Sequence, residues 1–208
     1  HGLLTAWDEE DRQQLVAVHM DQPGITVTDE GWNAVGMAAT GSVEVVFDGA
    51  WGLAVGSPGD YLARPGFWHG GIGIAACWYG AAQRLAEVLR EQCSKRPEPH
   101  ALAHLGAVDS ALNSAACVLR ASAKHVDREP QADARELAQQ TRACIEDTVE
   151  HVMRHVGRAV GAGPYCKDPH FAQLMADLPV YIRQSHAERD LAALGEQVAV
   201  APAGRWQL

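Results

Sequence analysis

The chain has 208 residues, with 26 acidic against 17 basic side chains and a formal net charge of -9. This length is enough for one domain of ordinary size, or for a small domain attached to a larger one, with a sizeable core. The acidic balance repels phosphate backbones and anionic lipid surfaces, and the basic residues are scattered, so we expect neither a nucleic-acid partner nor a membrane partner.

The first 60 or so residues have the pattern of short strands. Two β-branched runs, QQLVAVHM and GSVEVVFDGA, alternate with turn sequences such as DQPGI and GSPGD. The chain begins with His1 inside this region, as a piece of a longer protein would. We predict that residues 1–62 form a small, partial β-sheet domain.

Beyond Pro65 the apolar residues recur at steps of three and four, which is typical of helices packed in a bundle. Asp168 is available to cap the last helix, and Pro179 predicts a kink or restart within it. The expected helices cover about 66–93, 100–125 and 132–160, and a fourth begins near 169. The predicted fold class is therefore α+β, mostly α, with an antiparallel four-helix bundle over residues 63–208.

Five cysteines without a CxxC pair favour buried thiols in a reducing compartment over disulfides or a thiolate zinc site. No apolar run approaches the roughly 20 residues of a membrane span, and the N-terminus lacks a signal pattern. We therefore expect a soluble, cytoplasmic protein.

Two histidine pairs, His100 with His104 and His151 with His155, are each spaced four residues apart on predicted helices. Carboxylate-bridged bundle sites use Glu-x-x-His pairs, and the sequence contains none; HExxH is absent as well. We predict no metal site and interpret these histidines as packed or exposed side chains.

The stretch LPVYIRQSHAERDLAAL, residues 178–194, gathers several charged side chains in a segment that otherwise reads as helix. Glu188 with Arg183, Arg189 and Asp190 has the spacing of ordinary helical ion pairs. The alternative is a catalytic corner, and spacing by itself leaves both interpretations open.

Three segments, in this order, resemble the acyl-CoA dehydrogenase superfamily. GMAATGSVEVVFDGA (36–50) is similar to the family's GxRxTGSxxVxFxxV strand, and AACWYGAAQRLAEVLRE (75–91) to the opening helix of its bundle. GRAVGAGPYCKDPHFAQLMADLPVYIRQ (157–184) resembles the segment QxxGGxGY…P…RLxRDxxxxxI that leads to the active site. The resemblance covers part of the family's middle β-domain and its C-terminal helical domain.

This resemblance implies a flavoprotein that holds FAD between the β-domain and the bundle, with a neighbouring subunit completing the site. A glutamate in such enzymes removes a proton next to a thioester while the flavin accepts hydride. The expected partners are an acyl-CoA-like small molecule and further copies of the chain, as a homodimer or homotetramer.

The family's catalytic glutamate does not carry over. Ser185, His186 and Ala187 stand where the family has EGT, and the position of the alternative base is Gly70. Glu188, expected one helical turn beyond Ser185, remains a third candidate. The predicted catalytic residues are thus Ser185, His186 and Glu188, and the resemblance assigns cofactor binding to Arg96, Arg158, Gly161, Ala162 and Ala187.

We predict an acyl-CoA-dehydrogenase-like oxidoreductase acting on an acyl thioester or a related small substrate. Two alternatives remain open. One is a flavin-dependent monooxygenase, in which a histidine near this corner manages the flavin–oxygen adduct. The other is a non-catalytic relative that retains the bundle as an assembly module.

Overall fold

The computed structural model describes residues 1–207, and its chain divides into a first unit, His1–Phe67, and a second unit that begins at Trp68. The division falls slightly after the boundary expected from the sequence, because the short helix α1 (Asp60–Ala63) contacts β2 of the first unit. Tyr61 of this helix also makes an edge contact with Phe67.

The first unit contains two small antiparallel sheets. One has the strand order β1-β2-β5, built from Gly2–Trp7, Gln13–Val18 and Gly52–Val55; the other pairs β3 (Ile25–Val27) with β4 (Val45–Phe47). A 3-10 turn, η1 (Ala38–Thr40), lies in the connection between β3 and β4. The predicted strand character of this region is confirmed.

Few side chains are buried in this unit. Val18 is its one buried large apolar residue among residues 1–67, whereas Leu3, Trp51 and Leu53 are mostly exposed. A sheet is stable when one face is covered by another layer. The strands of the first unit therefore bury little apolar surface among residues 1–67.

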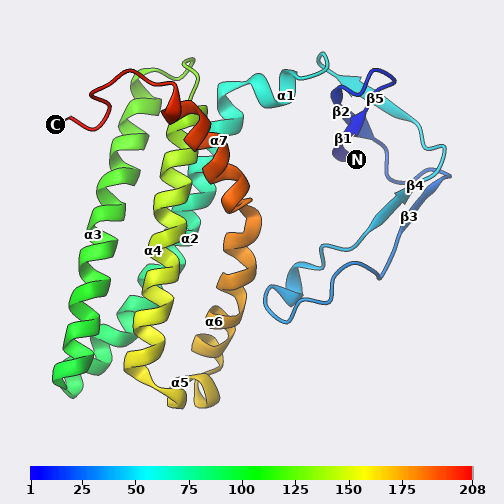
Figure 1. Cartoon of the computed structure of the whole chain (residues 1–208). Helices are drawn as coiled ribbons and strands as arrows, with labels where there is room; N and C mark the ends of the chain where they lie inside the picture. Colours follow the sequence, from blue (N-terminus) through cyan, green and yellow to red (C-terminus); the bar gives the residue numbers. More distant parts are fainter. Residues whose placement is uncertain (208) are drawn as a thin grey trace. The chain divides into compact units, whose positions relative to one another are not determined.

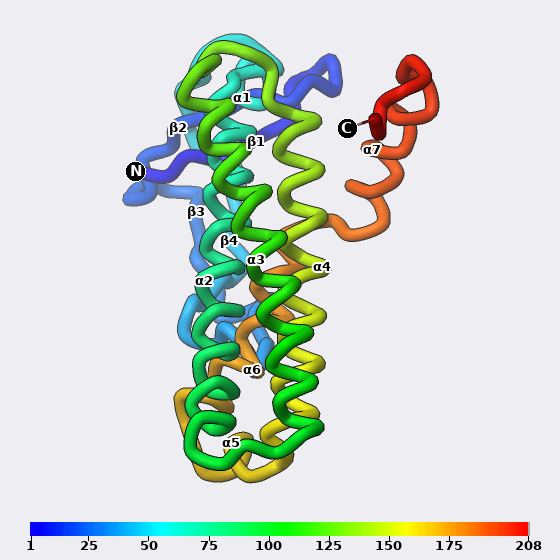
Figure 2. The backbone as a smooth tube through the Cα atoms, turned by 90° about the vertical axis from the view of Figure 1, so that its left-hand side faces the viewer, coloured from blue at the N-terminus to red at the C-terminus, as the bar shows by residue number. Residues whose placement is uncertain are grey.

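The second unit is a bundle of long helices that run side by side (Figures 1 and 2). Short connections make successive helices antiparallel. Its elements are α2 (Pro65–Lys95), α3 (Pro99–Arg128), α4 (Arg135–Val160), α5 (Ala162–Lys167), α6 (Pro169–Tyr181), η2 (Ile182–Gln184) and α7 (Glu188–Ala199). The predicted fold class, mostly helical with a small partial sheet, is confirmed.

The bundle core comes from stripes at alternating steps of three and four residues, as in left-handed helix packing. On α2 the buried side chains include Trp78, Leu85 and Leu89, and they meet Phe171 and Leu178 of α6 in one cluster. The α4 stripe consists of Ile145, Val149, Val152 and Val156, all fully buried.

Proline and acidic caps define where two helices begin. Glu98 accepts a hydrogen bond from the Ala101 amide at 2.9 Å, ahead of Pro99 at the start of α3. Asp168 does the same for α6, with the amides of His170 and Phe171 at 3.0 and 3.1 Å. The predicted Asp168 cap is confirmed, since its carboxylate satisfies amides that lack partners within the helix.

Pro179 does not break the chain where the sequence suggested. α6 continues through it to Tyr181, and the helical path ends only after η2. The break therefore lies after Pro179, and contacts with α4, described below, hold it there.

The cysteines also differ from expectation. All five thiols are free, but Cys77, Cys117 and Cys166 are exposed, and only Cys93 is buried. The prediction that they fill the core is therefore wrong for three of them. Cys77 and Cys117 lie off the buried stripes of α2 and α3, and Cys166 lies on α5, which buries none of its residues, so position in the helix, rather than the apolar character of a thiol, sets their exposure.

One helix is more apolar than the sequence analysis recognised. An 18-residue window of α3 has a mean hydropathy of 1.3, and only 17% of it is buried. By length and composition alone α3 could cross a membrane, which corrects the expectation that no segment qualifies. Such a helix is equally compatible with an apolar face that another protein chain covers.

Candidate functional site

The fourth bundle helix ends in a sharp turn that we call the corner, residues 183–187. Ser185 has an extended backbone, with φ -76° and ψ 157°, and α7 starts afresh at Glu188. Glu188 is therefore not one helical turn beyond Ser185, because the helix is interrupted between them. Its exposed side chain is the first of α7.

Arg142 of α4 ties this corner to α2. Its Nη2 donates to the Gln184 carbonyl and its Nη1 to the Gly71 carbonyl, both at 3.1 Å, and its guanidinium lies 4.7 Å from the centre of the Trp78 ring. Burial lowers the pKa of the Arg142 guanidinium, and the nearby carboxylates of Asp190 and Glu146 act in the opposite direction.

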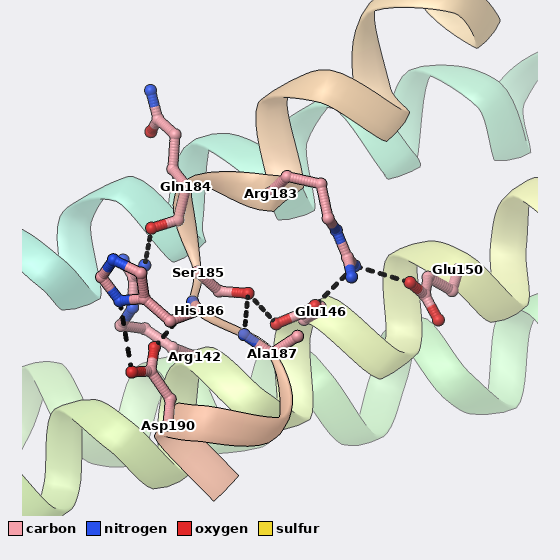
Figure 3. A network of polar contacts seen from close by, with 9 residues as sticks. All are labelled: Arg142, Glu146, Glu150, Arg183, Gln184, Ser185, His186, Ala187 and Asp190. Carbon is pink, nitrogen blue, oxygen red and sulfur yellow. Dashed lines mark hydrogen bonds and ion pairs between the residues drawn. The ribbon is translucent and has the colours of Figure 1, made fainter.

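Glu146, one helical turn along α4, holds the next residues of the corner (Figure 3). Its Oε2 accepts from the Ser185 hydroxyl at 2.5 Å, and its Oε1 accepts from Arg183 at 2.5 Å. Arg183 also donates to Glu150 at 2.7 Å. The expected helical pairing of Glu188 with Arg183 is thus wrong, because Arg183 crosses to α4.

These contacts assign Ser185 a structural position. Its side chain is buried, at 6% exposure, and its hydroxyl is directed to Glu146. A serine hydroxyl that donates to a carboxylate inside the fold stabilises the turn.

His186, unlike the buried Ser185, is open to solvent, with its side chain 60% exposed. Its Nδ1 lies 3.3 Å from Asp190 Oδ1, and its backbone N–H donates to Asp190 Oδ2 at 3.0 Å. One carboxylate on the first turn of α7 therefore contacts both the main chain and the ring of His186. The remaining ring nitrogen, Nε2, is the one that the Asp190 contact leaves for another partner.

Ala187 has a backbone conformation that side chains rarely adopt, with φ 45° and ψ -117°. These angles approach those of glycine at the first central position of a type II′ turn. The Arg189 amide donates to the His186 carbonyl at 3.0 Å, which closes the turn. Strain of this kind persists when surrounding contacts determine the conformation, as they do here.

The residues assigned to cofactor binding fall into two groups. Ala187 lies in the corner, while the other four lie at the end of the bundle where α2 meets α3 and α4 meets α5: Arg96, Arg158, Gly161 and Ala162. The 13 residues of α6 separate that end from the corner by about 20 Å. The structure does not bring the two groups together within one chain.

An open hollow of about 370 Å³ lies beside the corner and is lined by both apolar and charged side chains. This volume is near the lower end for small-molecule sites. Its lining residues are Glu150, Met153, Pro179, Ile182 and Arg183.

The histidine pairs meet between α3 and α4. Nδ1 of His104 lies 2.9 Å from Nδ1 of His155, and the His151 ring stacks on His155 with the ring centres 4.2 Å apart. Burial lowers the pKa of His155, and the neighbouring His151 and His104 act in the same direction. Over residues 1–207 no group of three or more His, Cys, Asp or Glu side chains is arranged to hold a metal ion.

Sequence reasoning missed the part that α4 plays. Arg142, Glu146 and Glu150 are spaced four residues apart, so they share one face of that helix. That spacing was a usable signal for a charged helix face. Its partners, three consecutive residues of the corner, are 33 to 42 positions away in the chain and could not be identified from it.

No protein-family model matches the sequence, and no curated protein matches it. Solved structures match its fold. A nitrososynthase from Micromonospora carbonacea var. africana is 22% identical, with a TM-score of 0.76 over 94% of this chain and 55% of that one. KijD3, in complex with FMN and dTDP-3-amino-2,3,6-trideoxy-4-keto-3-methyl-D-glucose, is 20% identical, with a TM-score of 0.75 over 94% and 53%.

Butyryl-CoA dehydrogenase from Megasphaera elsdenii is 17% identical, with a TM-score of 0.78 over 95% of this chain and 55% of that one. The chain therefore spans about half the length of the structures that it matches. At these identities the likeness establishes a shared fold.

Proposed function

We propose, from the acyl-CoA dehydrogenase superfamily fold that this chain has, that it is the sheet-and-bundle part of a flavoprotein oxidoreductase. The observation that carries the proposal is the match of both units to a butyryl-CoA dehydrogenase and to an enzyme bound to FMN. A flavin supplies the acceptor for hydride, which no protein side chain provides.

The residues assigned to the cofactor have suitable chemistry. Arg96 and Arg158 are exposed, and neither takes part in an ion pair among residues 1–207, so both guanidiniums are available to phosphate oxygens. Gly161 has φ 67°, and a Cβ there would meet nothing within 4 Å. This end of the bundle can therefore approach a dinucleotide closely, in keeping with FAD.

His186 is the group that we assign to proton transfer. Ser185 is committed to Glu146, and a serine is a poor acceptor for a carbon-bound proton. An imidazole takes up and releases protons near neutral pH. We retain Glu188, an exposed carboxylate two residues further on, as the alternative base.

The proposed reaction is oxidation of an acyl thioester or a related small substrate. His186 would take the proton next to the carbonyl, and hydride would leave the neighbouring carbon for the flavin. Oxygen-dependent hydroxylation is the second candidate, because His186 lies next to Ser185, which stands at the position of the usual glutamate, and an imidazole there could transfer protons in such a reaction. A bundle that only assembles or binds is the third.

We further propose that the chain assembles into a homodimer or homotetramer. The outward stripe of α3, opposite its buried residues, carries small uncharged side chains, Ala103, Gly106, Ser110, Cys117 and Ala121, before the charged Lys124 follows on the same face. A second copy could pack against such a face.

The first test is the flavin content of the full-length purified protein. We expect absorbance near the flavin bands and bleaching by acyl-CoA under anaerobic conditions. Oxygen consumption coupled to a hydroxylated product would select the monooxygenase instead. Protein without flavin, even after incubation with FAD and FMN, would leave only the assembly module.

The second test separates the candidate bases. We expect His186→Ala to reduce kcat about 10²-fold or more, in the range of general acid–base catalysis. Glu188→Gln should leave kcat within about threefold of the wild type. The reverse pattern would transfer the role to Glu188, and Glu196→Gln on the exposed face of α7 serves as the matched control.

A further inference from the structure

We propose that Asp190 is a positioning residue that orients the His186 ring, so that Nδ1 carries the proton and Nε2 faces the reacting group. The orientation is a property of this chain by itself, whereas its use in proton transfer rests on the proposed function.

The geometry begins with a shared carboxylate. Asp190 Oδ2 accepts the backbone N–H of His186 at 3.0 Å, and Oδ1 lies 3.3 Å from the ring Nδ1 (Figure 3). The backbone bond fixes the carboxylate relative to the residue whose ring it contacts. A carboxylate accepts and cannot donate, so it favours the ring tautomer with a proton on Nδ1.

Asp190 lies beside a cationic side chain that is itself fixed in place. The Arg142 guanidinium interacts favourably with its charge, and Arg142 is anchored to the carbonyls of Gln184 and Gly71. Ser185 is fastened to Glu146 on the other side of His186. The ring therefore projects from a turn whose two flanks are tied to α4.

The strained backbone agrees with this assignment. Ala187 lies between His186 and α7 with φ 45°, where a glycine would be free of strain. The turn directs the first residues of α7 back toward His186, which lets Asp190 reach over its main chain. An unfavourable conformation beside an exposed histidine is typical of functional turns.

The arrangement has a defined chemical use. When Nε2 takes a proton from a substrate carbon, an N–H bond forms, the C–H bond breaks and its electron pair stays with the substrate. The ring becomes an imidazolium, and the Asp190 carboxylate stabilises that charge. Without Asp190 the ring is free to turn or to place its proton on Nε2, which blocks this step.

A simpler role for Asp190 is capping, since it is the third residue of α7 and satisfies an amide near the helix start. Asp190→Asn separates the two roles. The amide oxygen still accepts the His186 N–H, whereas its NH₂ group faces Nδ1 as a donor and favours a proton on Nε2.

The decisive measurement is the His186 tautomer in the full chain, read from nitrogen chemical shifts of ¹⁵N-histidine-labelled protein at pH 8. The His186 signals are identified by their loss in His186→Gln. We expect the proton on Nδ1 in the wild type and in Glu196→Gln, and on Nε2 in Asp190→Asn, with all three unfolding at similar temperatures. A wild-type ring protonated on Nε2, or one tautomer shared by wild type and Asp190→Asn, overturns the proposal.

Turnover then tests the catalytic part. In flavin-loaded protein we expect Asp190→Asn to lower kcat about 10²-fold or more, with KM within about threefold. A switched tautomer with unchanged kcat overturns the use of His186 in the reaction and leaves its positioning by Asp190 intact. A protein that binds no flavin refutes the proposed function, and the tautomer result still decides the positioning.

Discussion

At the scale of single residues, the corner shows how neighbouring side chains acquire different roles. Ser185 is buried against Glu146, His186 is exposed against Asp190, and Ala187 bends the chain between His186 and α7. Ser185 is extended, so its side chain and that of His186 point to opposite sides, and the positive φ of Ala187 then turns the chain into α7. The strain at Ala187 is therefore linked to the start of α7 beside His186.

We predict that Ala187→Gly stabilises the protein. Glycine adopts positive φ without a steric penalty, so the variant should gain about 1 kcal/mol in unfolding free energy, and its Tm should rise by about 2–4 °C. Urea denaturation measures the change. Ala192→Gly, at an exposed position within α7, is the matched control and should lose about 1 kcal/mol. Equal losses in both variants would contradict a strained corner.

At the scale of helices, α4 organises the second unit. One of its faces carries the fully buried stripe from Ile145 to Val156, and a neighbouring face carries Arg142, Glu146 and Glu150. A third contact joins α4 to α3 through the buried hydrogen bond between Ser122 and Thr141, at 2.8 Å. The same helix thus supplies core packing and holds the corner.

The contact between α3 and α4 should depend on pH. Burial lowers the pKa of His155 in the folded protein, so the unfolded chain binds more protons at this residue. The free energy of unfolding must therefore decrease as the pH is lowered. The loss begins as pH falls below about 6.5, the ordinary value of histidine, and continues to the lower pKa of the folded state. The groups that face His155 are His104, His151, Arg154 and Arg158, all cationic or capable of becoming so.

Urea midpoints between pH 8 and pH 5 measure this effect. We expect His155→Gln to flatten the pH dependence of stability below about pH 6.5 relative to the wild type. His170→Gln, at an exposed position on α6, should leave the slope unchanged. An identical slope in the wild type and in His155→Gln would exclude a contribution from this pair.

At the scale of the whole molecule, each of the two units has an exposed apolar surface among the described residues. The sheet of the first unit exposes Leu3, Trp51 and Leu53, and α3 exposes most of an apolar helix. Exposed apolar area of this extent marks interaction surfaces.

We predict that Cys117→Glu disrupts assembly. Cys117 lies at the middle of the outward stripe of α3, where a buried, unpaired carboxylate would oppose contact with a second copy. Light scattering after size-exclusion chromatography should show a dimer or tetramer for the wild type and a smaller species for the variant. Arg154→Glu, at an exposed position on α4, is the control. A wild-type protein that is monomeric would contradict the proposed assembly.

The fold was largely predictable from the sequence because its signals are local. Alternating β-branched runs predicted the strands, steps of three and four predicted α2, α3 and α4, and the Asp168–Pro169 pair predicted the start of α6. The motifs that resemble the acyl-CoA dehydrogenase superfamily indicated its fold, which the structure confirms. These features depend on residues within one or two turns of each other.

The candidate site was only partly predictable, since its determinants are distant in the chain. Periodicity predicted helix through residues 178–194, with a kink or restart at Pro179 but no break at residues 185–187, and an intact helix there would have placed Glu188 above Ser185. The turn at residues 185–187 instead forms because Arg142 and Glu146 hold Gln184 and Ser185 from another helix. Those contacts act against a local helical preference of only a few tenths of a kcal/mol per residue.

The sequence by itself thus determined which segments are strands and helices and which kind of fold they build. Only the tertiary structure decided that the Ser185 hydroxyl is buried against Glu146 and that the exposed His186 ring lies beside Asp190. The physical reason is that helix and strand formation depends on neighbours along the chain, whereas the direction of a side chain at a turn depends on partners that packing brings to it.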